Sequence, residues 1–209
     1  MNETPSTATL PCRIAILGSG TGTNASAIVR YAQEHDAEGF TVALIVSTRP
    51  NVGIVEIAKR SRIPHVVIED RGEEFTRRLL EALSERRIEL IALAGFMRIL
   101  DAKVIQAMNG AIVNVHPALL PRHGGKGMYG IHVHQAVVDS QDRMTGVTVH
   151  MVSERYDEGE IIAQRSVRVE PSDTAVSLQE RVKLIEHELY PKAIAEHVRI
   201  MNLRGNSDQ

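Results

Sequence analysis

The chain has 209 residues and a formal net charge of −2, and 43% of its residues are hydrophobic. This length fits one large domain or two small ones, and the composition is that of a globular rather than a disordered protein. The 24 basic and 26 acidic residues nearly balance, which argues against nucleic-acid or membrane binding through a basic surface.

The sequence also predicts a cellular compartment. No apolar run approaches the ~18 residues of a membrane span, and the N-terminus lacks the charged and apolar regions of a secretory signal. The single cysteine, Cys12, cannot form a disulfide within the chain, which favours a reducing environment. We therefore expect a cytoplasmic protein.

The first half of the chain alternates short apolar runs with segments of helical periodicity. After a flexible extension over residues 1–12, the expected strands are 14–17, 41–47, 65–68, 90–94 and 111–115. The expected helices between them are 27–35, 53–61, 73–87 and one after Asp101. This alternation is typical of a parallel sheet covered by helices.

The pattern changes after His116. A Pro- and Gly-rich loop over 117–131 precedes a helix at 132–139, strand-like segments at 146–152 and 161–169, and a final helix from 174 to 201. Pro191 should kink that helix or begin a second one, and residues 202–209 form a flexible tail. We predict one α/β domain over 13–201: an open, mostly parallel twisted sheet with helices on both faces and an antiparallel addition near the C-terminal part.

A glycine-rich turn, Gly18-Ser-Gly-Thr-Gly-Thr-Asn24, joins the first strand to the first helix. Glycines let the backbone approach a ligand, and a helix N-terminus offers free amides that favour anions. The turn matches neither the dinucleotide-binding pattern nor the nucleotide P-loop. We favour a phosphate bound at Gly22, Thr23 and Asn24; the alternative is a tight turn in which Thr23 or Asn24 caps the helix.

Asn114 and His116 lie at the end of the strand over 111–115. Strand side chains alternate, so the two share one face, and Pro117 favours extended backbone at His116. Ligands of open parallel sheets bind beyond the carboxyl ends of the strands. The pair therefore offers two donors to a developing oxyanion, or else Asn114 is a buried amide bonded to nearby backbone and His116 caps the strand.

Two further features remain open from the residues alone. His132 and His134 form a weak metal-ligand pattern, but no cysteine lies nearby, and we expect no metal and a structural role for both. Asp157 lies in a turn, where aspartate is common. If that turn reaches His116, the carboxylate favours the protonated imidazole.

Four blocks in this order resemble the phosphoribosylglycinamide formyltransferase family of folate-dependent formyltransferases. They are Ser19–Asn24, Leu93–Leu100, Asn114–Pro121 and Asp157. The resemblance extends over residues 13–198. It implies transfer of a formyl group from 10-formyltetrahydrofolate, as co-substrate, to the amine of glycinamide ribonucleotide in purine biosynthesis. It implies small-molecule substrates, no nucleic-acid or membrane partner, and a monomer or homodimer.

The resemblance also assigns site residues. The catalytic group is implied at Asn114, His116 and Asp157, and the ribonucleotide site at Gly22, Thr23, Asn24 and Glu186. Folate contacts are implied at Arg71, at the backbone run Met97, Arg98, Ile99 and Leu100, and at Asn114, with the turn over 153–157 beside the pterin. Lys183 stands where many members have glutamine, and the loop over 122–130 is a longer variant that we expect to fold over the site.

Other members of this chemistry give alternative functions. Methionyl-tRNA formyltransferase and 10-formyltetrahydrofolate hydrolase resemble the Asn114–Pro121 block but not the glycine-rich turn. A non-catalytic phosphosugar binder would use that turn and leave Asn114, His116 and Asp157 as structural residues.

Overall fold

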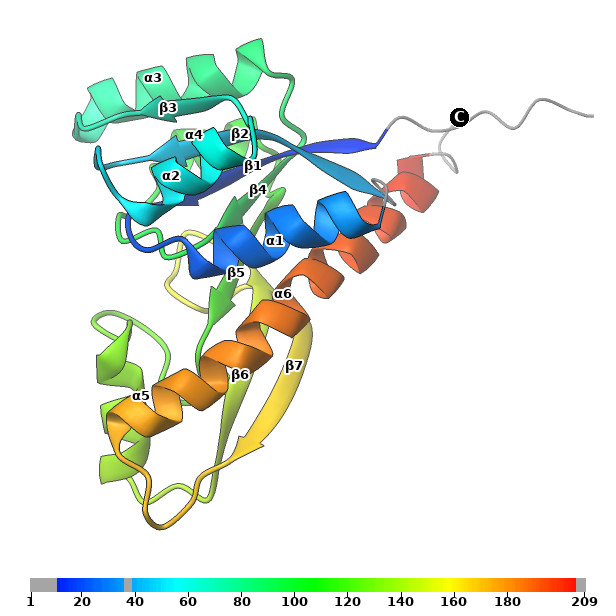
Figure 1. Ribbon diagram of the computed structural model, residues 1–209. Helices are drawn as coiled ribbons and strands as arrows, with labels where there is room; N and C mark the ends of the chain where they lie inside the picture. Colours follow the sequence, from blue (N-terminus) through cyan, green and yellow to red (C-terminus); the bar gives the residue numbers. More distant parts are fainter. Residues whose placement is uncertain (1–10, 36–38, 206–209) are drawn as a thin grey trace, which may run out of the picture.

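A computed structural model describes residues 11–35 and 39–205. Its seven strands are β1 (Cys12–Gly18), β2 (Phe40–Ser47), β3 (His65–Val67), β4 (Leu90–Leu93), β5 (Ile112–His116), β6 (Met144–Met151) and β7 (Ile161–Arg168). The helices are α1 (Thr23–Glu34), α2 (Gly53–Arg60), α3 (Gly72–Glu85), α4 (Ala102–Ala107), α5 (Ile131–Asp139) and α6 (Ala175–Gly205). The alternation predicted from the sequence is thus confirmed (Figure 1).

The strands form one mixed sheet in the order β3-β2-β1-β4-β5-β6-β7. The first five pair in parallel, whereas β6 runs antiparallel to β5, and β7 antiparallel to β6. The predicted fold class, including the antiparallel addition, is confirmed. In Figure 1 the parallel strands and helices α1 to α4 occupy one end of the molecule, and β6, β7 and α5 occupy the other.

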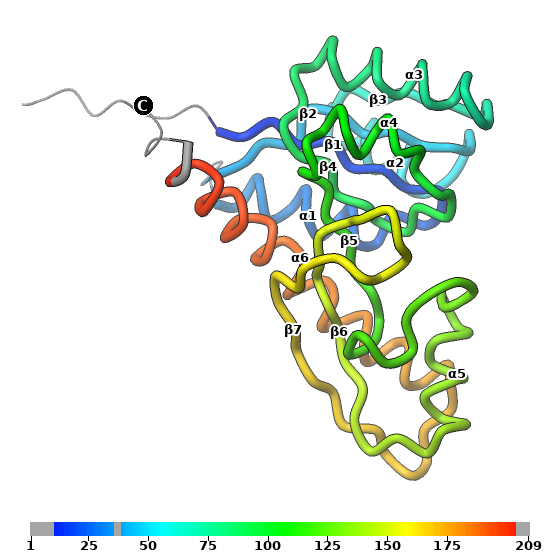
Figure 2. Tube along the Cα trace, turned by 180° about the vertical axis from the view of Figure 1, so that it is seen from behind, coloured from blue at the N-terminus to red at the C-terminus, as the bar shows by residue number. Residues whose placement is uncertain are grey.

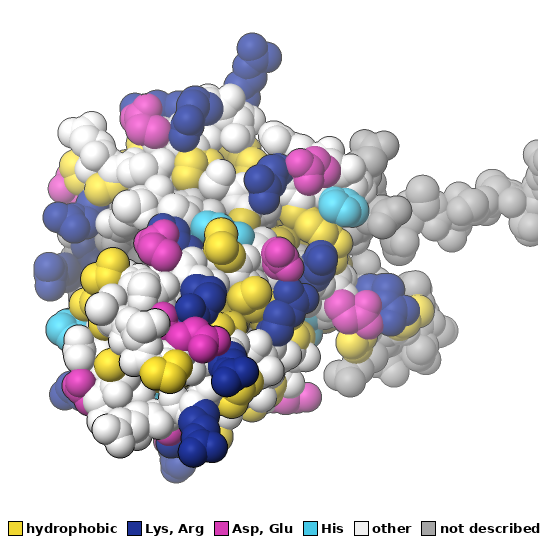
Figure 3. Space-filling view, turned by 60° about the horizontal axis from the view of Figure 1, so that its bottom comes forward, with side chains coloured by type: hydrophobic (Ala, Val, Ile, Leu, Met, Phe, Trp, Pro, Cys, Tyr) yellow, Lys and Arg dark blue, Asp and Glu magenta, His cyan; other side chains and the backbone are white. Residues whose placement is uncertain are grey.

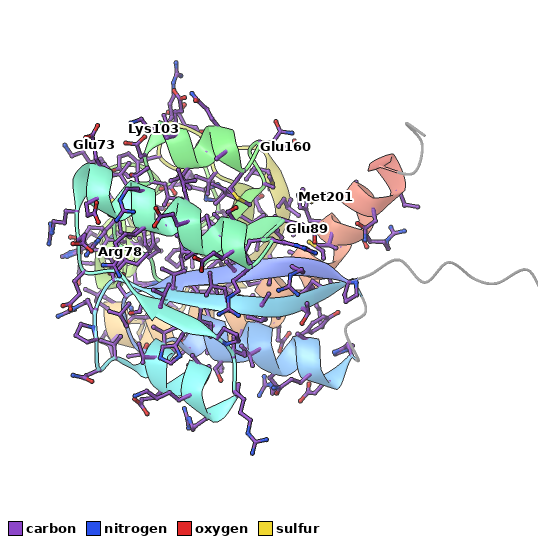
Figure 4. The ribbon with its side chains drawn as sticks, turned by 90° about the horizontal axis from the view of Figure 1, so that it is seen from above. Glu73, Arg78, Glu89, Lys103, Glu160 and Met201 are labelled. Atoms are coloured by element: carbon purple, nitrogen blue, oxygen red, sulfur yellow. The ribbon has the colours of Figure 1, made fainter. Side chains whose placement is uncertain are left out.

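Helices cover both faces of the parallel part of the sheet. One buried cluster joins α1, α2 and α6 to the sheet, and a second joins α3 and α4 to its opposite face. Figure 4 shows the strands between these layers, with Glu73 of α3 near Lys103 of α4. Along β1, Ile14 and Ile16 enter the first cluster while Ala15 and Leu17 enter the second. Strands buried on both faces must be apolar throughout, as β1 is.

The glycine-rich turn lies where the crossover connections diverge, between β1 and β4. This switch point is the usual ligand site of an open α/β sheet. Close packing shapes the turn: a Cβ on Gly53 would lie 2.1 Å from the carbonyl oxygen of Thr21. A Cβ on Gly18 would lie 2.6 Å from the carbonyl oxygen of Ala94, after β4. Only glycine fits at these two approaches.

Element boundaries differ from expectation at both ends of the chain. Cys12, predicted to lie in a flexible extension, belongs to β1, and its side chain is buried. Pro191 lies inside one continuous helix that extends to Gly205 instead of ending at Met201. The remainder of the predicted extension (1–10) and of the predicted tail (206–209) lies outside the described residues.

The molecular surface carries both signs of charge. On the face in Figure 3, lysine and arginine side chains lie among aspartate and glutamate side chains, as the near balance of the composition leads one to expect. Among the described residues, no helix is long and apolar enough to cross a membrane.

Helix α6 is fastened to the centre of the sheet by Tyr190. Its side chain is fully buried, and its hydroxyl lies 3.0 Å from the carbonyl oxygens of Leu93 in β4 and Val113 in β5. Burial raises the pKa of the phenol well above its ordinary value, so it stays a donor. The contacts of the Tyr190 hydroxyl with the two carbonyls fix α6 beside the strand ends that carry the candidate site.

We expect Tyr190→Phe to lower the free energy of unfolding by about 1–3 kcal/mol, because it removes the only donor that this side chain offers to two buried carbonyls. Chemical denaturation followed by circular dichroism measures the change. Tyr129→Phe, at a side chain that is half exposed, is the control and should change stability by less than ~0.5 kcal/mol. Equal stability of Tyr190→Phe and the parent would contradict this role.

Candidate active site

The glycine-rich turn ends at the N-terminus of α1. Gly22 is the N-cap residue, with a left-handed backbone (φ 76°) and no side-chain cap bond. The first hydrogen bond of the helix joins the Ser26 amide to the Gly22 carbonyl at 2.8 Å. The alternative in which Thr23 or Asn24 caps the helix is therefore wrong. The first amides of α1 remain available to an anion, favoured by the helix dipole.

Asn24 contacts Glu186 across the α1–α6 interface. The amide nitrogen Nδ2 donates to Oε2 of Glu186 at 2.7 Å, whereas Oδ1 of Asn24 is buried without a partner among the described residues. Burial raises the pKa of Glu186 to about 7, although the bond from Asn24 and the charge of Lys183 oppose this. The two residues that the family resemblance assigned to one substrate thus lie in direct contact.

A cavity of about 750 Å³ opens at the carboxyl ends of β1, β2 and β4. It is lined by residues 19–24, Thr48, Arg49, Glu69, Arg71, 94–95, Met97 and Arg98. Two groups of predicted residues therefore share one cavity: the turn at Gly22–Asn24, and the folate-assigned Arg71, Met97 and Arg98. Leu100 is buried in the core and Ile99 is exposed, and neither of them lines this cavity.

The guanidinium of Arg98 bonds to the protein's own backbone. It donates to the carbonyl oxygens of Thr48, Ile68, Glu69 and Asp70, and it lies 5.0 Å from the centre of the Phe75 ring. These bonds connect the segments that follow β2, β3 and β4. Arg98 therefore shapes the wall of the cavity through its side chain, which leaves its backbone for ligand contact.

Asn114 and His116 lie on the same face of β5, and β6 supplies the residues opposite them. His150 pairs with Asn114, and Thr148 pairs with His116. Nδ2 of Asn114 donates to Nε2 of His150 at 3.2 Å, while Nδ1 of His150 donates to the carbonyl of Met151 at 2.8 Å. His150 therefore fixes the orientation of the Asn114 amide, and Asn114 is bonded to a side chain rather than to backbone.

Asp157 approaches both histidines from the connection between β6 and β7, which Figure 2 shows beside the loop that follows β5. Its Oδ2 lies 3.6 Å from Nδ1 of His116, and its Oδ1 lies 3.6 Å from Nε2 of His150. The three side chains are mostly buried. The structure thus brings Asn114, His116 and Asp157 together, with His150 between the amide and the carboxylate.

Burial and charge act in opposite directions on this cluster. Burial lowers the pKa of His116, and the Asp157 charge and the His123 carbonyl offset only part of that effect. Burial raises the pKa of Asp157, but its interactions with His150, the Gly125 amide and His116 outweigh burial and lower the pKa overall. The carboxylate is therefore charged, and it raises the pKa of His116 as the sequence suggested, although burial makes the net shift of that pKa downward.

His150 is the residue that sequence reasoning missed. Strand alternation puts His150 and Thr148 on one face, but the register that sets His150 opposite Asn114 joins segments 36 residues apart. His134, for which we expected a place at a helix start or its surface, is buried. Within the described ranges, no group of three or more histidine, cysteine, aspartate or glutamate side chains could hold a metal ion.

The raised pKa of Glu186 predicts a pH-dependent cost to folding. Between its ordinary value of 4.5 and about 7, the folded chain holds a proton that the unfolded chain has lost, so stability falls as pH rises. Glu186→Gln keeps the acceptor for Asn24 and removes the charge. It should be more stable than the parent at pH 8, by at most ~3 kcal/mol, and equal to it near pH 4.

Urea unfolding at several pH values checks this expectation. Glu180→Gln, at an exposed carboxylate on the same helix, is the matched control and should give no pH-dependent gain. A Glu186→Gln variant that is less stable than the parent at pH 8 would show that the charge is not penalised.

Comparison with known proteins finds relatives of the kind that the resemblance suggested. The chain is 36% identical over 187 residues to the chloroplastic phosphoribosylglycinamide formyltransferase of Arabidopsis thaliana, covering 87% of this chain and 64% of that protein. It is 34% identical over 194 residues to the phosphoribosylglycinamide formyltransferase of Bacillus subtilis, covering 91% and 96%. The crystal structure of glycinamide ribonucleotide transformylase 1 from Geobacillus kaustophilus superposes with a TM-score of 0.83 at 37% identity, covering 90% and 100%.

The chain spans less than two thirds of the length of some curated relatives. The sequence model of the formyl transferase family, however, matches residues 12–194. That range includes both the glycine-rich turn and the cluster around Asp157, and it covers most of the chain. The chain belongs to the formyl transferase family.

Proposed function

We propose that the chain transfers the formyl group of 10-formyltetrahydrofolate to the amine of N1-(5-phosphoribosyl)glycinamide, a reaction of purine biosynthesis. The products are the formylglycinamide ribonucleotide and tetrahydrofolate. The observation that carries the proposal is the position of one carboxylate, Asp157, within 3.6 Å of His116 in a formyl transferase chain that also has a free helix N-terminus at the glycine-rich turn.

In this proposal the ribonucleotide phosphate binds the amides and hydroxyl of the segment from Gly22 to Asn24. Glu186, in contact with Asn24, binds the same substrate. The folate lies along the backbone from Met97 to Leu100, with Arg71 at the rim of the cavity and the turn over 153–157 beside the pterin. Asn114 is the register partner of Leu93 in β4, which directly precedes the cavity residues 94–95.

The amine attacks the formyl carbon, and a tetrahedral oxyanion forms. Nδ2 of Asn114 and the protonated imidazole of His116 donate to that oxygen, which is the electrostatic stabilisation that such a transition state requires. Nε2 of His116 already donates to the His123 carbonyl at 2.8 Å. The donor that faces the reaction is therefore Nδ1, the nitrogen next to Asp157.

Proton transfer completes the reaction. The attacking nitrogen must lose a proton and N10 of the folate must gain one as the carbon–N10 bond breaks. Asp157 is charged and lies beside His116, so it accepts the proton through a water molecule and returns it to N10 as a general base and acid. No covalent intermediate with the protein is required.

A folate absorbance assay separates the candidate functions. Formyl transfer that depends on glycinamide ribonucleotide supports this proposal. Deformylation without the ribonucleotide indicates a 10-formyltetrahydrofolate hydrolase, and formylation of methionyl-tRNA indicates the tRNA enzyme. Phosphosugar binding without any turnover indicates a non-catalytic binder.

We also propose a cytoplasmic location and small molecules as the only substrates. The near balance of basic and acidic residues supports the proposal about substrates, since tRNA binding favours a basic surface. Assembly as a monomer or a homodimer stays a prediction, which sedimentation of the purified chain would test.

Removing either oxyanion donor should slow the reaction strongly. We expect Asn114→Ala and His116→Ala each to lower kcat by about 10²–10³-fold, which is the usual cost of losing one such donor, with the fold intact by circular dichroism. His65→Ala, at an exposed histidine of β3, is the control and should keep the parent kcat. Near-normal turnover of either site variant would reject its assignment.

Replacing the carboxylate should move the pH profile. The Asp157 charge raises the pKa of His116 against the effect of burial, so Asp157→Asn should lower that pKa further. The limb of the kcat profile that requires protonated His116 should then move to lower pH, and the plateau should fall. A profile that matches the parent in shape and height would remove Asp157 from the mechanism.

A further inference from the structure

The loop between β5 and α5 (residues 117–130, the β5–α5 loop) bonds to both members of the His116–Asp157 pair. The carbonyl oxygen of His123 accepts from Nε2 of His116 at 2.8 Å. Two residues later, the amide of Gly125 donates to Oδ2 of Asp157 at 2.8 Å. One short stretch of backbone therefore contacts the imidazole and the carboxylate at once.

These two bonds constrain the chemistry of the pair. A carbonyl oxygen can only accept, so Nε2 of His116 carries a hydrogen, and proton exchange is confined to Nδ1 beside Asp157. The His123 carbonyl opposes the lowering of the His116 pKa by burial, and the Gly125 amide helps to hold down the pKa of Asp157. Both contacts therefore favour the charged form of the group that they touch.

The β5–α5 loop needs an anchor to hold this backbone in place. His123 has a left-handed backbone (φ 54°), which is uncommon for a residue other than glycine. Its ring is bonded to Asp142, with 2.6 Å between Nε2 and Oδ2. Both side chains are mostly buried, at 13% and 10% exposed. Charge-assisted bonds of this kind are among the strong ones.

Asp142 itself lies outside the reacting cluster, in the turn between α5 and β6. Its other oxygen accepts from Arg122, whose side chain is 66% exposed. The hydrogen bond from His123 is the largest cause that lowers the pKa of Asp142. Asp142 therefore holds the loop through a buried contact with His123 and an exposed contact with Arg122. Of these two residues, only His123 also contacts His116, through its backbone carbonyl.

We propose that Asp142 is a positioning residue for formyl transfer: by binding the ring of His123, it fixes the backbone that orients His116 and Asp157. This inference rests on the proposed function, since it assigns a role to a residue of that reaction. Packing supports it, because a Cβ on Gly124 would lie 2.5 Å from Cδ2 of Leu120 and 3.3 Å from Cβ of Asp157. The stretch between the two bonds thus lies directly against the carboxylate residue.

The primary test is Asp142→Ala with two independent measurements. The first is the ¹⁵N spectrum of His116, which distinguishes the two neutral forms of the imidazole. The parent should show hydrogen at Nε2, and the variant should lose that preference. The second is turnover: kcat should fall about 10–100-fold, since displacement of a reacting group by ~1 Å can cost ~10²-fold, while KM for the ribonucleotide stays within about twofold.

Matched variants isolate the buried contact. Arg122→Ala removes the exposed partner of the same carboxylate, and exposed ion pairs contribute little, so it should keep the parent kcat and His116 spectrum. Asp142→Asn keeps an acceptor for His123 and should lose less activity than Asp142→Ala. His123→Ala should match Asp142→Ala, and the double variant should be no worse than either, because both changes break one link.

Each outcome bears on the inference. A parent-like His116 spectrum and kcat in Asp142→Ala would overturn it, and so would a rise in KM with unchanged kcat, which would assign the loop to binding. If Asp142→Ala does not fold, His123→Ala and Asp142→Asn carry the same test. If the parent shows no formyl transfer, the proposed function fails, whereas the His116 spectrum still decides whether Asp142 orients the imidazole.

Discussion

The candidate site depends on one buried carboxylate, that of Asp157, which lies beside two imidazoles. Each oxygen of Asp157 lies 3.6 Å from a ring nitrogen, one from His116 and the other from His150. A charge in a mostly buried position is costly unless it is paired and hydrogen-bonded. The Gly125 amide supplies the hydrogen bond, and His116 supplies a partner that is positively charged when protonated.

The change of strand direction after β5 makes this cluster possible. The parallel strands end at the edge that carries the glycine-rich turn, as ligand sites of open α/β sheets require. β6 then runs antiparallel beside β5, so His150 lies opposite Asn114 and the following connection returns Asp157 to the same edge. In the proposed function, the parallel half thus provides the anion site and the antiparallel half provides acid–base chemistry, with Asn114 at the junction.

Local signals in the sequence were sufficient for the elements, the glycine-rich turn and the shared face of Asn114 and His116. Long-range register was not predictable, because the pairing of His150 with Asn114 depends on how two distant segments align. The same limit applies to the guanidinium of Arg98, because no local pattern predicts its bonds to four backbone carbonyls. The sequence also does not reveal how deeply His116 is buried, so the raising effect of Asp157 on its pKa was predicted but the downward net shift was not.

The α1–α6 interface buries two polar side chains at a cost in folding free energy. Oδ1 of Asn24 is buried without a partner among the described residues, and Glu186 beside it is buried at the expense of its charged form. Each feature costs folding free energy that a well-packed apolar pair would not. The α1–α6 interface therefore gives up some stability to keep two polar side chains, which the proposed function assigns to the ribonucleotide.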